Sequence, residues 1–142
     1  MALGRDLPVV LVWPGRAVAT PAVFRIRAGK ASGGFGPAVP DAVLERLAAD
    51  PIAALAELRN DLTEAACAVE PAIAEALAAV GRLPGCRLAR MSGSGSAVFG
   101  LFEEDRTAAA AVTLQERRPD WWVRATVLRS ARVETRLDRP PA

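Results

Sequence analysis

Residues 87–102 read RLARMSGSGSAVFGLF, in which two apolar runs flank a core of alternating serine and glycine. The runs, residues 88–91 and 97–102, have the length of buried strands, and the core between them predicts a turn. Gly93 and Gly95 have no Cβ, so the chain there can adopt a positive φ and lie close to another surface. Two interpretations are open: a small-residue hairpin turn, or a concavity of N–H groups and three hydroxyls that suits a phosphate. The spacing does not match the glycine-rich phosphate-binding motifs that open a helix.

Upstream of this stretch, the pattern predicts one strand followed by helices. Residues 7–13 form an apolar run that is typical of a strand buried on both faces. Thr20 suits an N-cap, followed by a short helix that ends at Phe24. The glycine-rich residues 28–40 predict a loop.

Helical spacing resumes beyond this loop. Asp41 and Asp50 are predicted to cap two helices, and Asn60 or Asp61 a third, because Asp and Asn are common N-caps. Proline cannot continue the hydrogen bonding of a helix, so Pro71 should begin a fourth helix after a kink. The predicted buried face of the last two helices consists of Leu62, Val69, Ile73, Leu77 and Val80.

Downstream of the turn, Asp105 is predicted to cap a helix to about Arg117, and residues 121–128 read as the last strand. We therefore expect a single domain over residues 1–128 and a frayed polar tail over residues 129–142. The order strand, helices, strand, strand, helix, strand predicts an α+β fold. Its architecture is the split βαβ ferredoxin-like sandwich, an antiparallel sheet with helices on one face.

Composition narrows the class of protein. With 142 residues and a hydrophobic fraction of 51%, the chain is long enough to bury one core without a metal or a disulfide. The net charge of +2 is too small to predict a strong electrostatic attraction to nucleic acid or to a membrane surface. There is no histidine, and we expect Cys67 and Cys86 to be reduced, free thiols. No signal peptide and no apolar run of about 18 residues is evident, so we expect a soluble, cytoplasmic protein.

Three motifs, taken together, point to a known family. Residues 7–24 read LPVVLVWPGRAVATPAVF, Asn60-Asp61 opens a long helical pattern, and ARMSGSGSAVFGLF follows at residues 89–102. In this order and spacing, roughly residues 7–128 resemble the C-terminal half of the 4-diphosphocytidyl-2-C-methyl-D-erythritol kinase family. That family belongs to the small-molecule kinases that include the galactose, homoserine, mevalonate and phosphomevalonate kinases.

The resemblance implies an activity and a fold. The fold is the ferredoxin-like one that the element order predicts. The activity is transfer of the γ-phosphate of ATP to the 2-hydroxyl of the diphosphocytidyl-methylerythritol intermediate of non-mevalonate isoprenoid precursor biosynthesis. ATP and Mg²⁺ are the cofactors implied for the complete kinase.

The resemblance also implies roles for individual residues. Phe24 matches the aromatic residue that stacks on the cytosine of the substrate, and Thr20 a threonine beside it that could donate a hydrogen bond. The turn of Ser92, Gly93, Ser94, Gly95 and Ser96 matches a motif that packs against the ATP loop and borders the phosphates. Asn60 and Asp61 match a helix start that could line the cleft. From the residues alone, Phe24 could equally be a core residue, Thr20 a helix cap, and Asn60 or Asp61 a cap.

The catalytic parts of that family have no match in this chain. They are a lysine-bearing strand, a glycine- and serine-rich ATP loop and an aspartate in a "GADVPF"-like segment, all of the N-terminal half. We therefore expect no catalytic residue, no metal site and no bound ATP or Mg²⁺ in this chain alone. The implied partners are a cytidine-containing small molecule and an N-terminal kinase domain, on the same or a separate chain. One departure is Trp13, where many members carry Asn or His before Pro-Gly.

Two other functions compete with this hypothesis. A stand-alone ligand-binding or regulatory module is one, because ferredoxin-like sheets carry many unrelated functions. An RNA-binding domain on the same fold is the other, and it needs aromatic side chains together on one sheet face. Phe99 and Phe102 are three residues apart and should face opposite sides of their strand, so we expect no nucleic-acid partner.

Overall fold

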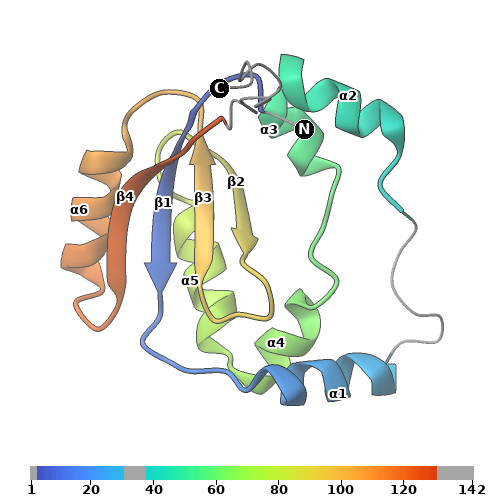
Figure 1. Cartoon of the computed structure of the whole chain (residues 1–142). Coiled ribbons are helices and arrows are strands. Elements are labelled where there is room, and N and C mark those ends of the chain that lie inside the picture. Colours follow the sequence, from blue (N-terminus) through green and yellow to red (C-terminus); the bar gives the residue numbers. More distant parts are fainter. Residues whose placement is uncertain (1–2, 31–37, 131–142) are drawn as a thin grey trace, which may run out of the picture.

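Four strands form one antiparallel sheet in this computed structural model, which describes residues 3–30 and 38–130 (Figure 1). The strands are β1 (Leu7–Trp13), β2 (Cys86–Met91), β3 (Val98–Phe102) and β4 (Trp122–Leu128), in the order β2-β3-β1-β4. The pair β1 and β2 is split by β3, which is antiparallel to both. This arrangement confirms the predicted α+β split βαβ fold.

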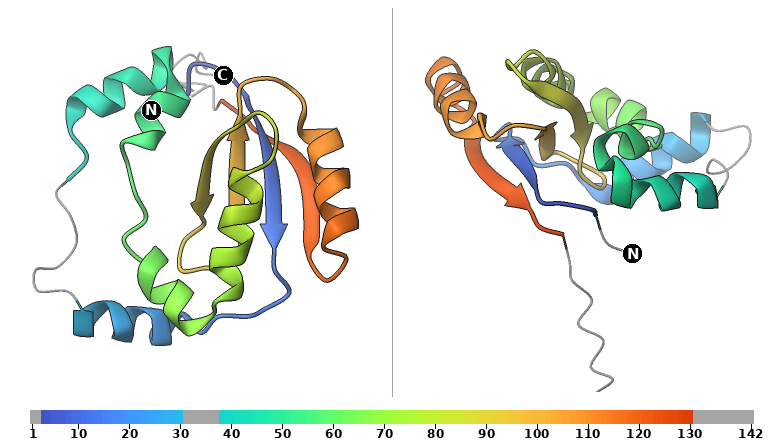
Figure 2. Two further views of the ribbon diagram at one scale, coloured as in Figure 1. Left: turned by 180° about the vertical axis from the view of Figure 1, so that it is seen from behind. Right: turned by 90° about the horizontal axis from the view of Figure 1, so that it is seen from above.

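The described residues also form six helices. They are α1 (Thr20–Lys30), α2 (Asp41–Ala49), α3 (Pro51–Ala56), α4 (Thr63–Val69), α5 (Ala72–Gly81) and α6 (Thr107–Arg117). Helices α5 and α6 lie side by side on one face of the sheet (Figure 2). Helices α1 and α4 contact each other at the end where the β2–β3 turn lies, and α2 and α3 lie at the opposite end (Figure 1).

The main core lies between the sheet and helices α5 and α6. Alternate strand residues point to it, because successive side chains of a strand face opposite sides. Thus Val10, Val98 and Val123 face the helices and are at most 3% exposed. The predicted helical face is confirmed: Ile73 and Val80 are fully buried, and Leu62, Val69 and Leu77 pack around them.

The opposite face of the sheet is only partly covered. At the α3 end, Leu7, Val9 and Leu101 are buried in a second cluster with Ile52 of α3. At the other end, no described helix covers the sheet on this side, and several side chains of β1 and β4 stay exposed.

Helix α1 is longer than the sequence predicted. It runs past Phe24 to Lys30, because residues 25–28 carry no stop signal and Gly29 alone costs a helix only about 1 kcal/mol. The loop predicted over residues 28–40 therefore starts later, and its residues 31–37 lie outside the described part of the chain.

Side-chain caps were predicted with mixed success. Asp50 does cap α3, accepting from the Ala53 N–H at 3.2 Å. Asp41 is instead the first residue of α2, and Asp105 lies before Arg106, which occupies the N-cap of α6. Of the predicted tail, Ser130 donates its N–H to Asp6 at 2.8 Å, and residues 131–142 are outside the described residues.

We expect Ile73→Ala to lower the free energy of unfolding by about 2–5 kcal/mol, because it leaves a cavity between α5 and the sheet. Urea unfolding followed by circular dichroism measures this. The matched control is Val112→Ala on the outer side of α6, where the side chain is 58% exposed and a change within about 0.5 kcal/mol is expected. Equal effects of the two substitutions would contradict this core.

Candidate functional site

The turn between β2 and β3 packs against the core at its second glycine, Gly95. Gly93 and Gly95 have positive φ values of 56° and 92°. A Cβ on Gly95 would lie 3.0 Å from Ile73 Cδ1 and 3.2 Å from Met91 Sδ. A Cβ on Gly93 would meet nothing within 4 Å. Gly95 therefore faces the core and Gly93 faces outward.

The hydroxyls of the turn are mostly engaged within the protein. Ser96 is 5% exposed and its Oγ donates to the Arg16 carbonyl, while the Ser94 Oγ pairs with Thr20 Oγ1 at 2.8 Å. Of the three hydroxyls that were expected to add donors for a phosphate, that of Ser96 is buried and already donates within the protein. Within the described residues, the N–H groups of Gly93 and Ser94 have no acceptor, so backbone groups remain for an anion.

Thr20 brings the start of α1 to this turn. Near the start of α1, which begins at Thr20, the N–H groups of Ala22 and Val23 donate to the Ala19 carbonyl at 2.9 and 3.3 Å. Thr20 therefore lies inside the helix, and the prediction that it is the N-cap is wrong. Its hydroxyl instead pairs with Ser94, which is 74 residues away in sequence.

Phe24 lies one helical turn after Thr20 and is 44% exposed. Its neighbour Val23 is fully buried and supplies the core side of α1. Residues four apart lie on the same side of a helix, so the Phe24 ring and the Thr20 hydroxyl share one surface. The interpretation of Phe24 as a core residue is therefore wrong.

Asn60 ties the segment before α4 to the turn. Its Nδ2 donates to the carbonyls of Met91 at 3.0 Å and Gly93 at 2.7 Å, and its Oδ1 accepts from the Leu62 N–H at 3.0 Å. Leu62 occupies the N-cap of α4 and no side chain caps that helix, so the prediction of an Asn60 or Asp61 cap is wrong. Asp61 pairs with Arg59 at 3.0 Å.

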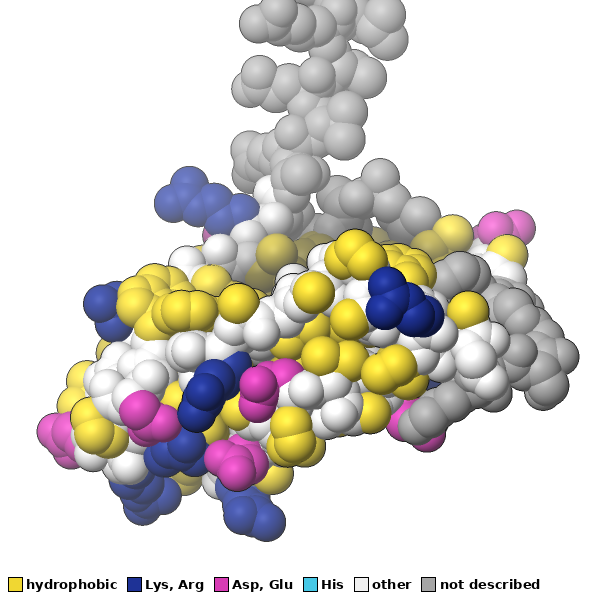
Figure 3. All heavy atoms as spheres, turned by 90° about the horizontal axis from the view of Figure 1, so that it is seen from below, with side chains coloured by type: hydrophobic (Ala, Val, Ile, Leu, Met, Phe, Trp, Pro, Cys, Tyr) yellow, Lys and Arg dark blue, Asp and Glu magenta, His cyan; other side chains and the backbone are white. Residues whose placement is uncertain are grey.

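A hollow of about 440 Å³ opens beside this linkage, between α1 and the start of α4. Its lining includes both Asn60 and Asp61, together with Arg27 of α1. Figure 3 views the molecule from this end, where apolar side chains lie among both basic and acidic ones. The structure thus gathers the three predicted motifs at one end of the sheet.

Arg90, on β2 just before the turn, is a residue that the sequence analysis missed. Its guanidinium donates to the Leu58 carbonyl, and burial lowers its pKa. This bond and those of Asn60 hold residues 58–60 against β2 and the turn. No local signal distinguished Arg90, since a strand arginine reads as an ordinary exposed residue.

Reactive groups and metal ligands do not gather at this site. Cys67 and Cys86 are free thiols, and burial raises the pKa of both, which disfavours the nucleophilic thiolate. Across residues 3–30 and 38–130, no three His, Cys, Asp or Glu side chains are grouped as a metal site would need. None of the helices in those ranges is long and apolar enough to cross a membrane.

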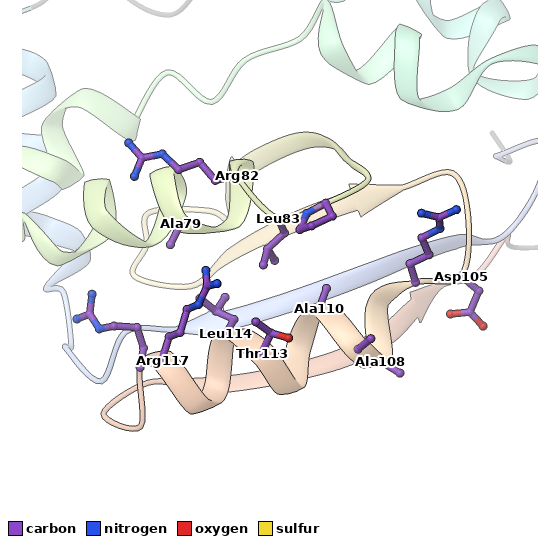
Figure 4. Close-up of a pocket in the computed structure, with 13 residues that line it drawn as sticks. Ala79, Arg82, Leu83, Asp105, Ala108, Ala110, Thr113, Leu114 and Arg117 are labelled. Atoms are coloured by element: carbon purple, nitrogen blue, oxygen red, sulfur yellow. The ribbon is translucent and has the colours of Figure 1, made fainter.

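A larger hollow lies elsewhere, between α5 and α6. This groove of about 910 Å³ has an apolar floor with Leu83 and Leu114, and arginines such as Arg82 and Arg117 lie along it (Figure 4). It contains none of the residues that the sequence singled out for substrate.

Comparisons with known proteins agree on one family. Residues 42–117 match the model for the C-terminal domain of GHMP kinases. The 4-diphosphocytidyl-2-C-methyl-D-erythritol kinase of Dinoroseobacter shibae is 51% identical over 126 residues, which cover 87% of this chain and 42% of that protein. The Cereibacter sphaeroides enzyme of the same name is 45% identical over 117 residues, covering 81% and 41%.

A solved structure supports the same conclusion. The crystal structure of a 4-(cytidine 5'-diphospho)-2C-methyl-D-erythritol kinase superposes with a TM-score of 0.65 at 35% identity, covering 88% of this chain and 44% of that one. The chain therefore spans about two fifths of the length of the curated relatives it matches.

The two glycines of the turn should respond differently to alanine. Gly93→Ala places a side chain at positive φ and should cost about 1–3 kcal/mol. Gly95→Ala carries the same strain and also displaces Ile73 and Met91, which adds about 1–3 kcal/mol. Urea unfolding of both variants checks this order. A larger loss of unfolding free energy for Gly93→Ala than for Gly95→Ala would contradict the described packing of the turn against the core.

Asn60→Asp should destabilise the domain by about 1–3 kcal/mol, because a carboxylate replaces the amide that donates to two carbonyls. Hydrogen exchange at the turn amides should quicken with it. The control is Arg59→Gln, which removes an ion pair of a 78% exposed side chain, and we expect a loss below about 1 kcal/mol. A loss for Asn60→Asp no larger than that of the control would contradict the linkage.

Proposed function

We propose, because this chain belongs to the GHMP kinase C-terminal family, that it is the substrate-facing half of a 4-diphosphocytidyl-2-C-methyl-D-erythritol kinase. The proposed reaction is transfer of the γ-phosphate of ATP to the 2-hydroxyl of 4-diphosphocytidyl-2-C-methyl-D-erythritol. The observation that carries the proposal is the convergence of three motifs, through the bonds of Thr20 and Asn60 to the glycine turn. Relatives at 45–51% identity that are named as kinases favour it over a stand-alone regulatory module.

Phe24 is the proposed platform for the cytosine base. Its ring is 44% exposed on a helix whose adjacent residue, Val23, is anchored in the core, so the platform is both accessible and rigidly held. Stacking of a base on an aromatic ring contributes about 1–3 kcal/mol. Thr20 orients this surface toward the turn through its bond to Ser94.

The turn is proposed to border the phosphates of the nucleotide. Gly93 faces outward with open space beside it, so a second loop can approach the backbone closely there. The N–H groups of Gly93 and Ser94, which have no acceptor among the described residues, can donate to phosphate oxygens.

The remaining machinery is assigned to an N-terminal half, on the same or a separate chain. Phosphoryl transfer depends on Mg²⁺-bound phosphates, a cation and a group that orients the nucleophile. The described residues carry no grouped acidic side chains that would hold Mg²⁺. We propose that the N-terminal half supplies the binding groups for ATP and Mg²⁺, and we assign no catalytic residue to this chain. We propose the cytoplasm as its compartment, where ATP is available and the two free thiols stay reduced.

The test combines this chain with the N-terminal part of the Dinoroseobacter shibae relative. The mixture should phosphorylate 4-diphosphocytidyl-2-C-methyl-D-erythritol with ATP and Mg²⁺, and the chain alone should not. Phe24→Ala should lower kcat/KM about 5- to 150-fold, the equivalent of the lost stacking, and Phe24→Tyr should retain activity. Turnover by the chain alone, or full activity of Phe24→Ala, would contradict the assignment.

A further inference from the structure

Strand β4 is an edge of the sheet, and only the first part of that edge is covered. Its inner side pairs with β1 over its whole length. On its outer side, Gln115 of α6 donates to the Trp121 carbonyl at 2.6 Å and accepts from the Val123 N–H at 3.1 Å. The Val123 carbonyl accepts from the Arg124 guanidinium at 2.8 Å. The outer backbone groups at the start of β4 therefore have partners within the chain.

The later part of this edge is open. Backbone groups of successive strand residues face opposite sides, so the outward set that includes Val123 continues with Ala125 and Val127. The Ser130 N–H, which donates to Asp6 at 2.8 Å beside β1, fits the inward set. On the outer side, no described residue gives the N–H and C=O groups of Ala125 and Val127 a partner. These groups are available for another strand.

Apolar side chains flank the open part of the edge. A hollow of about 350 Å³ lies between α6 and β4, and its lining includes Val112 and Ala125. Val112 and Val127 are 58% and 49% exposed, although neither belongs to the candidate site. Figure 1 shows α6 beside β4 at this border of the sheet. An open backbone edge beside an apolar hollow is the arrangement that accepts an added strand.

We propose that this edge binds the same edge of a second copy of the chain, with the two β4 strands antiparallel. The open residues determine the register, because Ala125 must lie opposite the partner's Val127 for all of their outward groups to form hydrogen bonds. Thr126 then lies opposite the partner's Thr126, on a two-fold axis. Such an interface uses the same surface on both copies, so the assembly closes at a dimer.

The side chains of the edge complement one another in this register. The exposed Val127 of each copy lies opposite the small Ala125 of the other, and both point to the α6 side of the sheet. Val127 thereby enters the hollow that Val112 and Ala125 line. The knob and the hollow lie on one surface of one chain, which favours a second copy over an unrelated peptide.

The charges at the border of the hollow are complementary as well. In the same register, Arg129 of one copy lies opposite Val123 of the other, where Glu116 of α6 lines the hollow. Glu116 and Arg129 are both exposed, and among the described residues neither has an ion-pair partner. Two-fold symmetry forms this pair of opposite charges twice.

The first experiment measures self-association of the 142-residue chain by sedimentation equilibrium. We expect a dimer, and Val127→Lys should raise its Kd about 10-fold or more, because it places a charge in the apolar hollow. The matched control is Val39→Lys, which changes a valine that is 42% exposed ahead of α2 and should alter the Kd less than about 2-fold. Circular dichroism confirms that each variant is folded.

A charge exchange tests the pairing itself. Glu116→Arg and Arg129→Glu should each raise the Kd about 5-fold, because each places like charges opposite one another. The chain that carries both substitutions should return to within about 2-fold of the original Kd, since opposite charges then face again. A double variant as weak as the single ones would contradict the register.

A cysteine at the axis tests the register independently. Thr126→Cys should form a covalent dimer when diamide is the oxidant, because facing residues of a non-hydrogen-bonded pair have the closest side chains. Arg124→Cys, which lies opposite the partner's Leu128, should not exceed the background of the original chain with Cys67 and Cys86. Equal cross-linking of the two variants would contradict the proposed axis.

Other results would overturn the inference as a whole. They are a chain that stays monomeric over the micromolar range, and a dimer that Val127→Lys leaves intact. A third is protection of the Ala125 and Val127 amides from hydrogen exchange that does not depend on protein concentration, because another segment of the same chain would then occupy the edge. The kinase assignment is tested separately, since none of these residues belongs to the candidate site.

Discussion

The candidate site depends on one contact, the close packing of Gly95 against the core. A single Cβ at this position would lie within 3.2 Å of both Ile73 and Met91, so the turn can occupy its place only because that atom is missing. Ile73 in turn is held fully buried by the packing of α5 on the sheet. The position of a flexible-looking serine–glycine sequence is therefore determined by the hydrophobic core beneath it.

Two sets of long-range hydrogen bonds join other segments to the turn that Gly95 positions. Asn60 reaches the carbonyls of Met91 and Gly93, and Thr20 reaches the hydroxyl of Ser94, so the starts of two helices are fixed to one turn. Each linkage uses neutral hydrogen bonds, which place groups without adding charge to the site. The proposed half-site is consequently a scaffold that positions Phe24 and backbone N–H groups, and it leaves the charge chemistry of phosphoryl transfer to another domain.

The elements that sequence reasoning predicted well are those whose signal is burial. The strands around the turn and the α5 face with Ile73 and Val80 follow from apolar periodicity, which reports the core directly. Side-chain caps were predicted less well. At Thr20 and Asn60 the side chain had two possible partners, a local N–H and a distant group, and the distant group lies within reach only once the sheet and α5 have packed.

The sequence by itself determined the order of strands and helices, the turn at residues 92–96 and the motifs that identify the family, because these depend on local chemistry and on the alternation of apolar residues. Tertiary structure alone decided which partners Thr20, Asn60 and Arg90 take, since each bond joins segments more than 30 residues apart. It also decided that Trp13 and Trp122 lie side by side on an uncovered face. Pairing of strands separated by about a hundred residues sets that register, and no local pattern records it.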